Sequence, residues 1–330
     1  MLPAWLDFNK KAQSRPKLFK VIQYLLDSLL YYITPMPIRI SAIISDFDGT
    51  LCPTGSVKTE DGNIPPDLQN VLWSISEKIP ICIISSKDFY FLKEKTQFAS
   101  IISAIIDTEI LQFTRVNNKK VHLFGNELTN GGQGVNRFLN TIAHNRVSSP
   151  NDLLKLSEPL EELAKLAADE FQDLSVEYKY TYVEKILAGI TLDYRHLQKW
   201  QQYKSNIEPN LAKMIHKFSS LLPNKLHVQT YLDHPFIDIY PIKRDKAQAV
   251  NTIVSLLRLN DKDKFLYLGD SENDNNAFKM ADLSIGVHSD PRIMTKLESD
   301  YLIEFNELRP FLQRLETEDF VFYRMSENIA

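Results

Sequence analysis

The sequence has few of the features that mark zinc-binding or disulfide-stabilised proteins. Of its 330 residues only two are cysteine, Cys52 and Cys82, and their separation matches neither a CxxC pair nor a zinc-ligand spacing. Isolated cysteines with apolar neighbours are typical of small buried packing residues. They also suit a reducing compartment better than an oxidising one. We therefore expect a cytoplasmic protein.

An excess of positive charge is missing as well. Lys and Arg together number 38 and Asp and Glu 42, so the formal net charge is −4. A protein that binds nucleic acid usually shows a basic patch and a high isoelectric point. The composition therefore predicts no nucleic-acid partner.

Long apolar runs are also scarce. Charged side chains are scattered through the first 20 residues, so no secretory signal is expected. Residues 18–33 carry apolar side chains at helical spacing, but Asp27 interrupts them and the stretch is shorter than the roughly 20 residues of a membrane span. Two interpretations stay open for this helix: it packs on the protein or on a second subunit, or it binds weakly at a membrane interface. The oligomeric state is not predicted.

Two separated parts of the chain show alternating strands and helices. Apolar strands and amphipathic helices are expected at 38–45, 66–77, 81–84, 89–97 and 101–106, and again at 247–257 and 265–268. Uninterrupted apolar strands separated by helices indicate a parallel sheet that is covered on both faces.

The middle of the chain has another pattern. Helices are expected at 150–173 and 207–222, and antiparallel strands within 176–194 and 226–240. The length also favours about two domains. The predicted fold class is therefore α/β. Its organisation is a Rossmann-like core of residues 38–126 and 236–330, an α+β insert of residues 127–235, and a helical extension of residues 1–37.

Acidic residues follow the first strand of the predicted sheet, in the segment Ser45–Thr50 (SDFDGT). Ligands of parallel sheets bind outside the carboxyl ends of the strands. Asp46 and Asp48 would repel each other without a cation, and Mg²⁺ prefers such oxygen ligands while leaving positions for phosphate oxygens. A carboxylate can also attack phosphorus and form an aspartyl phosphate. The alternative is an acidic loop that caps the next turn.

Polar residues also follow other strands. Ser85 can donate a hydrogen bond to a phosphate oxygen, although a serine at a strand end is commonly a helix cap. Lys246 can supply a positive charge, a role for which two neighbouring basic residues compete. Asp270 and Asp274, in GDSEND, add carboxylates that can complete a cation site.

Taken in order, SDFDGT, IISS, the lysine of DKAQAV and LGDSEND resemble the four motifs of the haloacid dehalogenase superfamily of phosphohydrolases. The resemblance covers the two parts of the predicted core. It implies that Asp46 attacks phosphorus. It also implies that Asp48 protonates the leaving oxygen and then activates water.

The same resemblance implies the ligands of the phosphate and of a magnesium ion. Ser85 and Lys246 would bind the phosphoryl group, with the hydroxyl of Thr50 beside them. The magnesium ligands would be Asp46, the backbone carbonyl of Asp48 and Asp270, with Asp274 as a further ligand or as a supporting partner.

The insert contains a stretch that resembles the substrate-reading motif of the trehalose-6-phosphate phosphatases. Glu184, Tyr194 and Arg195 fall in register with that motif, whereas Asp193 replaces its histidine and Lys185 lies one residue early. The resemblance implies a phosphosugar substrate, with trehalose 6-phosphate first. Sucrose phosphate and a mannosyl phosphoglycerate stay open. The alternative for Glu184 and Arg195 is a cross-strand ion pair on a solvated face.

The sequence therefore predicts a magnesium-dependent phosphatase that hydrolyses a sugar phosphate through an aspartyl phosphate, in carbohydrate metabolism. Three rival hypotheses share parts of this pattern. They are a phosphotransferase such as a phosphomannomutase, a receiver-like module that accepts phosphate without turnover, and an inactive scaffold.

Overall fold

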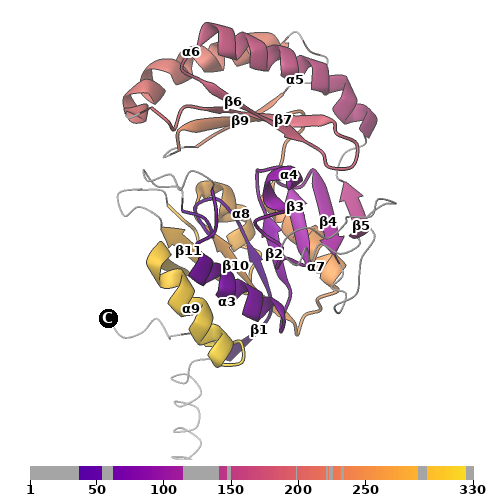
Figure 1. The fold of residues 1–330 in the computed structure, drawn as a ribbon, viewed down its shortest axis with the longest axis vertical. Coiled ribbons are helices and arrows are strands. Elements are labelled where there is room, and N and C mark those ends of the chain that lie inside the picture. The colour runs from indigo at the N-terminus through magenta and orange to yellow at the C-terminus, as the bar shows by residue number, and fades with distance from the viewer. Residues whose placement is uncertain are drawn as a thin grey trace, which may run out of the picture.

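The computed structural model describes residues 37–53, 62–113, 141–146, 150–197, 199–220, 222, 226–231, 234–288 and 296–324. These residues form a larger sheet with helices on both faces and a smaller sheet that lies across one end of it (Figure 1). The helical extension was expected over residues 1–37. Residues 1–36 lie outside the described residues, and the first strand begins at Pro37.

The larger sheet has the strand order β12-β11-β10-β1-β2-β3-β4-β5. Its strands are β1 (Pro37–Ser45), β2 (Ile81–Ile84), β3 (Ile101–Ala104), β4 (Glu109–Phe113), β5 (Thr141–Arg146), β10 (Lys264–Gly269), β11 (Leu283–His288) and β12 (Tyr301–Glu304). Strands β12 to β3 run parallel, whereas β4 and β5 are antiparallel to their neighbours. A short strand, β13 (Val321–Tyr323), pairs with the start of β1.

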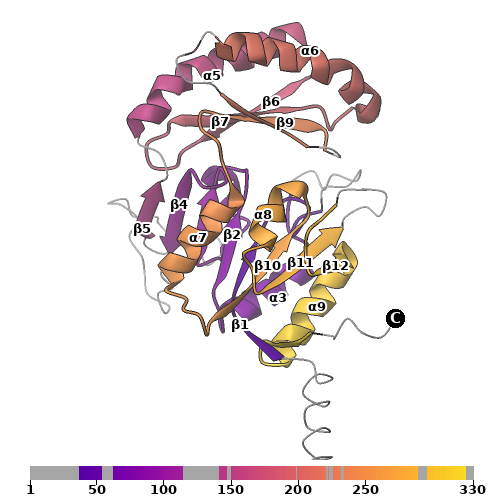
Figure 2. The same ribbon diagram turned by 180° about the vertical axis from the view of Figure 1, so that it is seen from behind.

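Helices cover both faces of this sheet (Figures 1 and 2). One face carries α3 (Pro66–Ser76) and α9 (Phe305–Thr317), and the other carries α7 (Lys246–Leu257) and α8 (Asn275–Phe278). Successive strand residues point to opposite faces, so Ile43 packs in one apolar cluster and Ile44 in the other. The alternation of apolar strands and helices therefore produced the expected two-sided core.

The helix expected over 89–97 is shorter than predicted. Helix α4 (Phe89–Leu92) begins at Asp88, whose carboxylate accepts a hydrogen bond from the amide of Phe91. After Leu92 the hydroxyl and the amide of Thr96 both donate to the Leu92 carbonyl, and the chain continues in turns. A threonine that bonds the backbone in this way competes with helix propagation.

The smaller sheet is antiparallel, with the order β6-β7-β9-β8. Its strands are β6 (Ser175–Tyr180), β7 (Leu187–Asp193), β8 (His227–Thr230) and β9 (Phe236–Tyr240). Helices α5 (Pro150–Glu170) and α6 (Trp200–Ser220) pack on the face turned away from the larger sheet (Figures 1 and 2). The opposite face is turned toward the carboxyl ends of β1, β2 and β10. The α+β character expected for the insert is confirmed.

The strand pairing differs from the insert boundaries that we expected at 127 and 235. Strand β5 pairs with β4 in the larger sheet, and β9 pairs with β7 and β8 in the smaller one. Ile237 and Ile239 of β9 pack beneath α5 and α6. Their alternation predicts a strand, but alternation does not name the sheet in which a strand pairs. We therefore propose that the insert begins between β5 and α5 and ends between β9 and α7.

Two expectations from composition concern cysteines and membranes. Both cysteines are buried and free, as packing residues should be. Within the described part of the chain, no helix combines the length and the apolar character that a membrane crossing requires. The apolar stretch 18–33 lies outside the described residues.

Candidate active site

A pocket lies between the carboxyl ends of the larger sheet and the inner face of the smaller one. Its floor includes Asp46, Asp48, Lys246 and Asp270, and its roof includes Arg195 and other side chains of the smaller sheet. The pocket has a free volume of about 50 Å³. A cavity of this size holds a few water molecules. The smaller sheet is therefore closed over the carboxyl ends of the larger one.

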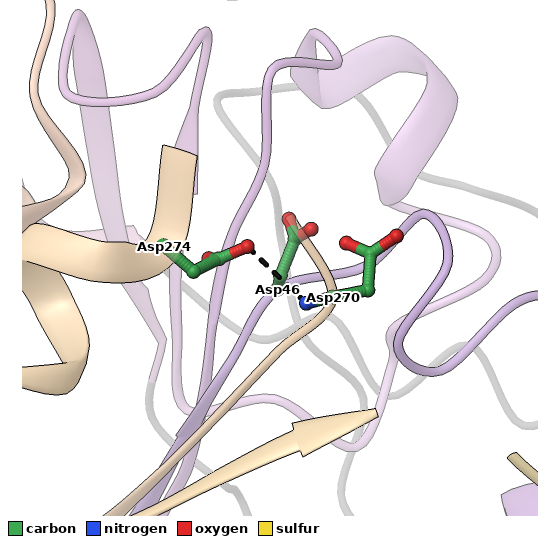
Figure 3. Close-up of side chains that lie close together, drawn as sticks. All are labelled: Asp46, Asp270 and Asp274. Carbon is green, nitrogen blue, oxygen red and sulfur yellow. Dashed lines mark hydrogen bonds between the residues drawn. The ribbon is translucent and has the colours of Figure 1, made fainter. Parts of the chain in front are cut away.

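Three carboxylates converge on the floor of the pocket. Asp46, at the end of β1, and Asp270 and Asp274, after β10, each offer an oxygen within 4.8 Å of the others (Figure 3). Burial raises the pKa of Asp46 to about 7, with Lys246 opposing and the nearby carboxylates adding to the rise. Burial and the Asp46 carboxylate likewise raise the pKa of Asp270 well above its ordinary value. The cluster thus holds more negative charge than its surroundings compensate.

Lys246 supplies positive charge to this cluster. It is the first residue of α7, directly after Asp245, whose carboxylate accepts from the amide of Ala247 and caps the helix. Its Nζ lies 3.1 Å from Asp46 Oδ1 and 2.8 Å from Asp274 Oδ1. Burial alone would lower the pKa of Lys246, but the two carboxylates outweigh it and raise the pKa above its ordinary value. The lysine therefore stays charged beside the predicted nucleophile.

Asp274 belongs to the short 3₁₀ turn η1 (Glu272–Asp274), and both of its oxygens already accept hydrogen bonds. Its Oδ1 accepts from Lys246 and, at 2.6 Å, from the hydroxyl of Tyr267. Its Oδ2 accepts from the amide and hydroxyl of Ser271, each at 3.1 Å, and from the amide of Asp270 (Figure 3). Of the two alternatives for Asp274, this geometry favours the supporting partner over the direct metal ligand.

The remaining oxygen donors fit a magnesium ion. Asp46 and Asp270 offer carboxylate oxygens in an environment that disfavours their negative charge, and Mg²⁺ binds through one or two such groups. Gly49 allows the Asp270 carboxylate to lie against the backbone. The φ of Gly49 is +81°, and a Cβ there would lie 1.7 Å from Asp270 Oδ2. Any other residue would collide with the site.

The predicted phosphate-binding hydroxyls, of Ser85 and Thr50, are buried and do not line the pocket. Ser85 is buried at the end of β2, and its Oγ accepts a hydrogen bond from the amide of Lys87. Thr50 is also buried, and its hydroxyl has no partner among the described residues. The pocket wall itself is formed by Ser86 and Lys87. In the segment IISSK, the residues that line the pocket are therefore the second serine and the lysine, which follow Ser85.

The two substrate residues predicted in the insert are separated. Arg195 lines the pocket, where its Nε lies 2.6 Å from Asp193 Oδ2 and its guanidinium lies over the ring of Phe236. Glu184 lies in the turn between β6 and β7 and does not line this pocket. Arg195 is thus paired with Asp193, the residue that stands in place of the motif's histidine. The alternative, an ion pair between Glu184 and Arg195, is not the pair that Arg195 forms.

Contacts between the two sheets involve residues that the sequence analysis did not single out. Lys87 reaches Glu177 of β6 at 2.6 Å, and the amide of Tyr180 donates to Asp88. On the other side of the pocket, Gln229 of β8 donates to Asn273. Glu177 lies on β6, whose sequence SVEYKY alternates charged with apolar or aromatic side chains, and this pattern is the signal that could have revealed it.

Fold and site together define an α/β enzyme whose acidic centre lies at the carboxyl ends of parallel strands, beneath an inserted sheet. The model of the haloacid dehalogenase-like hydrolase family matches residues 43–307 of the sequence. The chain belongs to this family of hydrolases. No curated protein sequence matches the chain.

Solved structures share this fold at low sequence identity. A structure described as a trehalose-6-phosphate phosphatase related protein is 15% identical with a TM-score of 0.55, covering 84% of this chain and 98% of its own. The C-terminal domain of the C. albicans trehalose-6-phosphate phosphatase is 16% identical with a TM-score of 0.57, covering 85% and 93%. A haloacid dehalogenase-like hydrolase from Bacteroides thetaiotaomicron is 14% identical with a TM-score of 0.55, covering 84% and 100%.

Proposed function

We propose that this hydrolase is a magnesium-dependent phosphatase that cleaves phosphate monoesters with Asp46 as its nucleophile. The observation that carries the proposal is the cluster of Asp46, Asp270 and Asp274 around a single buried lysine, at the carboxyl ends of β1 and β10. Such an excess of carboxylate is compatible with a metal ion and with an anionic phosphoryl group beside Lys246.

In the proposed reaction, an oxygen of Asp46 attacks phosphorus and the bond to the leaving alcohol breaks. Asp48, which lines the same pocket, gives its proton to the leaving oxygen. It then takes a proton from the water that cleaves the aspartyl phosphate, so that phosphate is released and both aspartates return to their first state.

The other residues bind and neutralise the phosphoryl group. Lys246 places its ammonium beside the attacking carboxylate. Ser85 accepts from the Lys87 amide, which leaves the hydroxyl hydrogen of Ser85 to donate to a phosphoryl oxygen. Asp46, Asp270 and the backbone carbonyl of Asp48 would hold Mg²⁺, which when bound neutralises charge that builds up on the transferred group.

For the substrate we propose a sugar phosphate, with trehalose 6-phosphate first. Support comes from the motif residues Tyr194 and Arg195 and from the position of Arg195 in the roof of the pocket. Because the closed pocket has only about 50 Å³ of free volume, a disaccharide enters only when the smaller sheet moves away from the larger one. The contacts of Lys87 and Gln229 are among those that must break for this movement.

Phosphate release from a panel of sugar phosphates and p-nitrophenyl phosphate tests the proposal. The wild type should release phosphate with Mg²⁺ and lose activity with a chelator. Asp46→Asn should lower the rate at least about a thousandfold, since the nucleophile is gone. The matched control is Asp169→Asn, the same change at an exposed position of α5. Equal activity of Asp46→Asn and wild type, or no hydrolysis of any ester, would contradict the proposed function.

A further inference from the structure

The inner face of the smaller sheet contains a buried ion pair that the proposed chemistry does not use. Lys179 Nζ of β6 lies 2.8 Å from Asp238 Oδ1 of β9, and both side chains are 1% exposed. Burial opposes the charge, but Lys179 and neighbouring hydroxyls outweigh burial and lower the pKa of Asp238 below its ordinary value. Asp238 is therefore a carboxylate, and its charge is compensated by Lys179.

Two hydroxyl groups that line the pocket also contact this carboxylate. Thr191 Oγ1 of β7 lies 2.5 Å from Asp238 Oδ1, and the hydroxyl of Tyr231 lies 2.7 Å from Oδ2. An ionised carboxylate only accepts hydrogen bonds, so both hydroxyls must donate their single hydrogen to it. Burial and the Asp238 charge raise the pKa of Tyr231 well above its ordinary value, so that Tyr231 keeps this hydrogen.

Both hydroxyl oxygens are thereby left with lone pairs only. Thr191 and Tyr231 line the pocket together with Asp46. Asn273 donates to Tyr231 at 3.4 Å, which shows that the tyrosine oxygen takes the acceptor role. A ligand group that meets these oxygens must bring hydrogen-bond donors. A carboxylate or a second phosphate, which accepts only, would find no donor in either hydroxyl.

The charges nearby favour a neutral group in the same place. Lys179 is engaged by Asp238, and Arg195 is engaged by Asp193. Lys87 is engaged by Glu177 in the same way. Arg195 in the roof, Lys87 in the wall and Lys179 beside Asp238 therefore each have a carboxylate partner already, whereas Thr191 and Tyr231 present oriented acceptors to the pocket.

We propose that Thr191 and Tyr231 are specificity-determining residues, which accept hydrogen bonds from hydroxyl groups of the leaving alcohol. The buried pair Lys179–Asp238 is the positioning element that turns both hydroxyl hydrogens away from the substrate. The site then selects polyhydroxylated, otherwise neutral phosphate esters over esters that carry a second anionic group. This inference rests on the proposed phosphatase function and narrows its substrate class.

The test compares kcat/KM for three kinds of ester. They are trehalose and glucose 6-phosphates with their deoxy analogues, esters with a second anion such as 3-phosphoglycerate and fructose 1,6-bisphosphate, and p-nitrophenyl phosphate. The variants are Thr191→Val, which keeps the shape and removes the hydroxyl, Thr191→Ser, which keeps the hydroxyl, and Tyr231→Phe. Thr230→Val makes the same change at an exposed position of β8 and is the matched control.

We expect Thr191→Val and Tyr231→Phe to lower the ratio of kcat/KM between hydroxylated sugar phosphates and p-nitrophenyl phosphate about tenfold each, the effect of one lost hydrogen bond. Thr191→Ser and Thr230→Val should keep the wild-type ratio. The loss in Thr191→Val should shrink on the deoxy analogue that lacks the contacted hydroxyl. A thermal unfolding midpoint measured for each variant separates this pattern from general destabilisation, which lowers activity on every ester alike.

Three results would overturn the inference. The first is an equal loss in Thr191→Val and Thr191→Ser, the second an unchanged ratio in both hydroxyl-deleted variants, and the third a wild-type preference for esters with a second anion. In each of these the wild type still hydrolyses phosphate esters, so the proposed function stands. If the wild type hydrolyses none of the esters, p-nitrophenyl phosphate included, the proposed function fails and the inference fails with it.

Discussion

The two sheets each bury carboxylates beside a lysine, but they balance the charge differently. In the larger sheet, Asp46, Asp270 and Asp274 surround Lys246, and burial raises the pKa of Asp46 to about 7. In the smaller sheet, Asp238 accepts hydrogen bonds from Lys179, Thr191 and Tyr231, and its pKa is lowered. Carboxylates in excess indicate a site for an added cation. A carboxylate that is fully paired serves instead to hold its neighbours in place.

The largest expected effect comes from removing a carboxylate of the larger sheet. Asp270→Asn should lower phosphate release at least about a hundredfold, because a proposed metal ligand is lost. Without Mg²⁺ the same variant should melt at a higher temperature than the wild type, because burial and the Asp46 carboxylate raise the pKa of Asp270 and so disfavour its negative charge, which asparagine does not carry. Calorimetry with and without Mg²⁺ checks both parts.

Mg²⁺ should raise the melting temperature of the wild type and of Asp169→Asn, but not that of Asp270→Asn. If Mg²⁺ stabilised all three proteins equally, Asp270 would not be a ligand.

A substitution in the ion pair of the smaller sheet should instead destabilise the protein. Lys179→Met should reduce the free energy of unfolding by about 3–5 kcal/mol, because it leaves the buried Asp238 carboxylate without its cation. Chemical denaturation measures this loss. Lys165→Met, at an exposed position of α5 paired with Glu161, is the control and should change the free energy by less than about 1 kcal/mol. Similar losses in the two variants would show that the buried pair is not special.

A smaller effect should appear in the pH dependence of stability. Because the pKa of Asp238 is lower in the folded protein, its interactions stabilise the fold fully above the unfolded pKa of about 3.9. This contribution is lost as the pH falls through the lowered folded pKa. The difference in unfolding free energy between wild type and Asp238→Asn should thus be constant near neutrality and shrink below about pH 4. If the difference in unfolding free energy did not change with pH, the pKa of Asp238 would not be lowered in the folded protein.

The smallest effect is expected at the contact that joins the two sheets. Lys87 is buried and Glu177 is only partly exposed, so Glu177→Gln should cost about 1–2 kcal/mol of stability, less than the loss expected at the fully buried pair Lys179–Asp238. It should, however, raise KM for a sugar phosphate severalfold, with a smaller change in kcat, because closure of the smaller sheet over the substrate is weakened. Steady-state kinetics at low and high salt check this. Glu161→Gln on α5 is the control, and an effect confined to kcat would argue against a role in closure.

Much of the larger sheet could be predicted from the sequence because its signals are local. Apolar strands such as Ile81–Ile84 alternate with helices, and strand ends of a parallel sheet meet at one edge. The structure accordingly brings Asp46, Asp270 and Lys246 into contact, although they lie far apart in the sequence. Their chemical roles stay predictions, as does the metal ion.

What could not be predicted depends on partners that lie far away in the chain. The alternation of Ile237 and Ile239 does not say that β9 pairs in the smaller sheet. Glu184 matches a motif, yet the turn between β6 and β7 holds it away from the pocket. Thr191 and Asp238 are polar residues in otherwise apolar strands, and only the pairing of β7 with β9 shows that they share one hydrogen bond.

The most direct test of the central claim is to trap the phosphoryl group on the enzyme. The protein is mixed with Mg²⁺ and a hydrolysed ester, quenched in acid during turnover, and treated with borohydride, which reduces an acyl phosphate but leaves serine and threonine phosphates intact. Trypsin cleaves after Arg39 and Lys58 and releases the peptide of residues 40–58, which contains Asp46. Mass spectrometry of this peptide locates the modified residue. The account predicts reduction of Asp46 to homoserine in the wild type, and none without substrate. Turnover with no modification, or with modification of another residue, would contradict it.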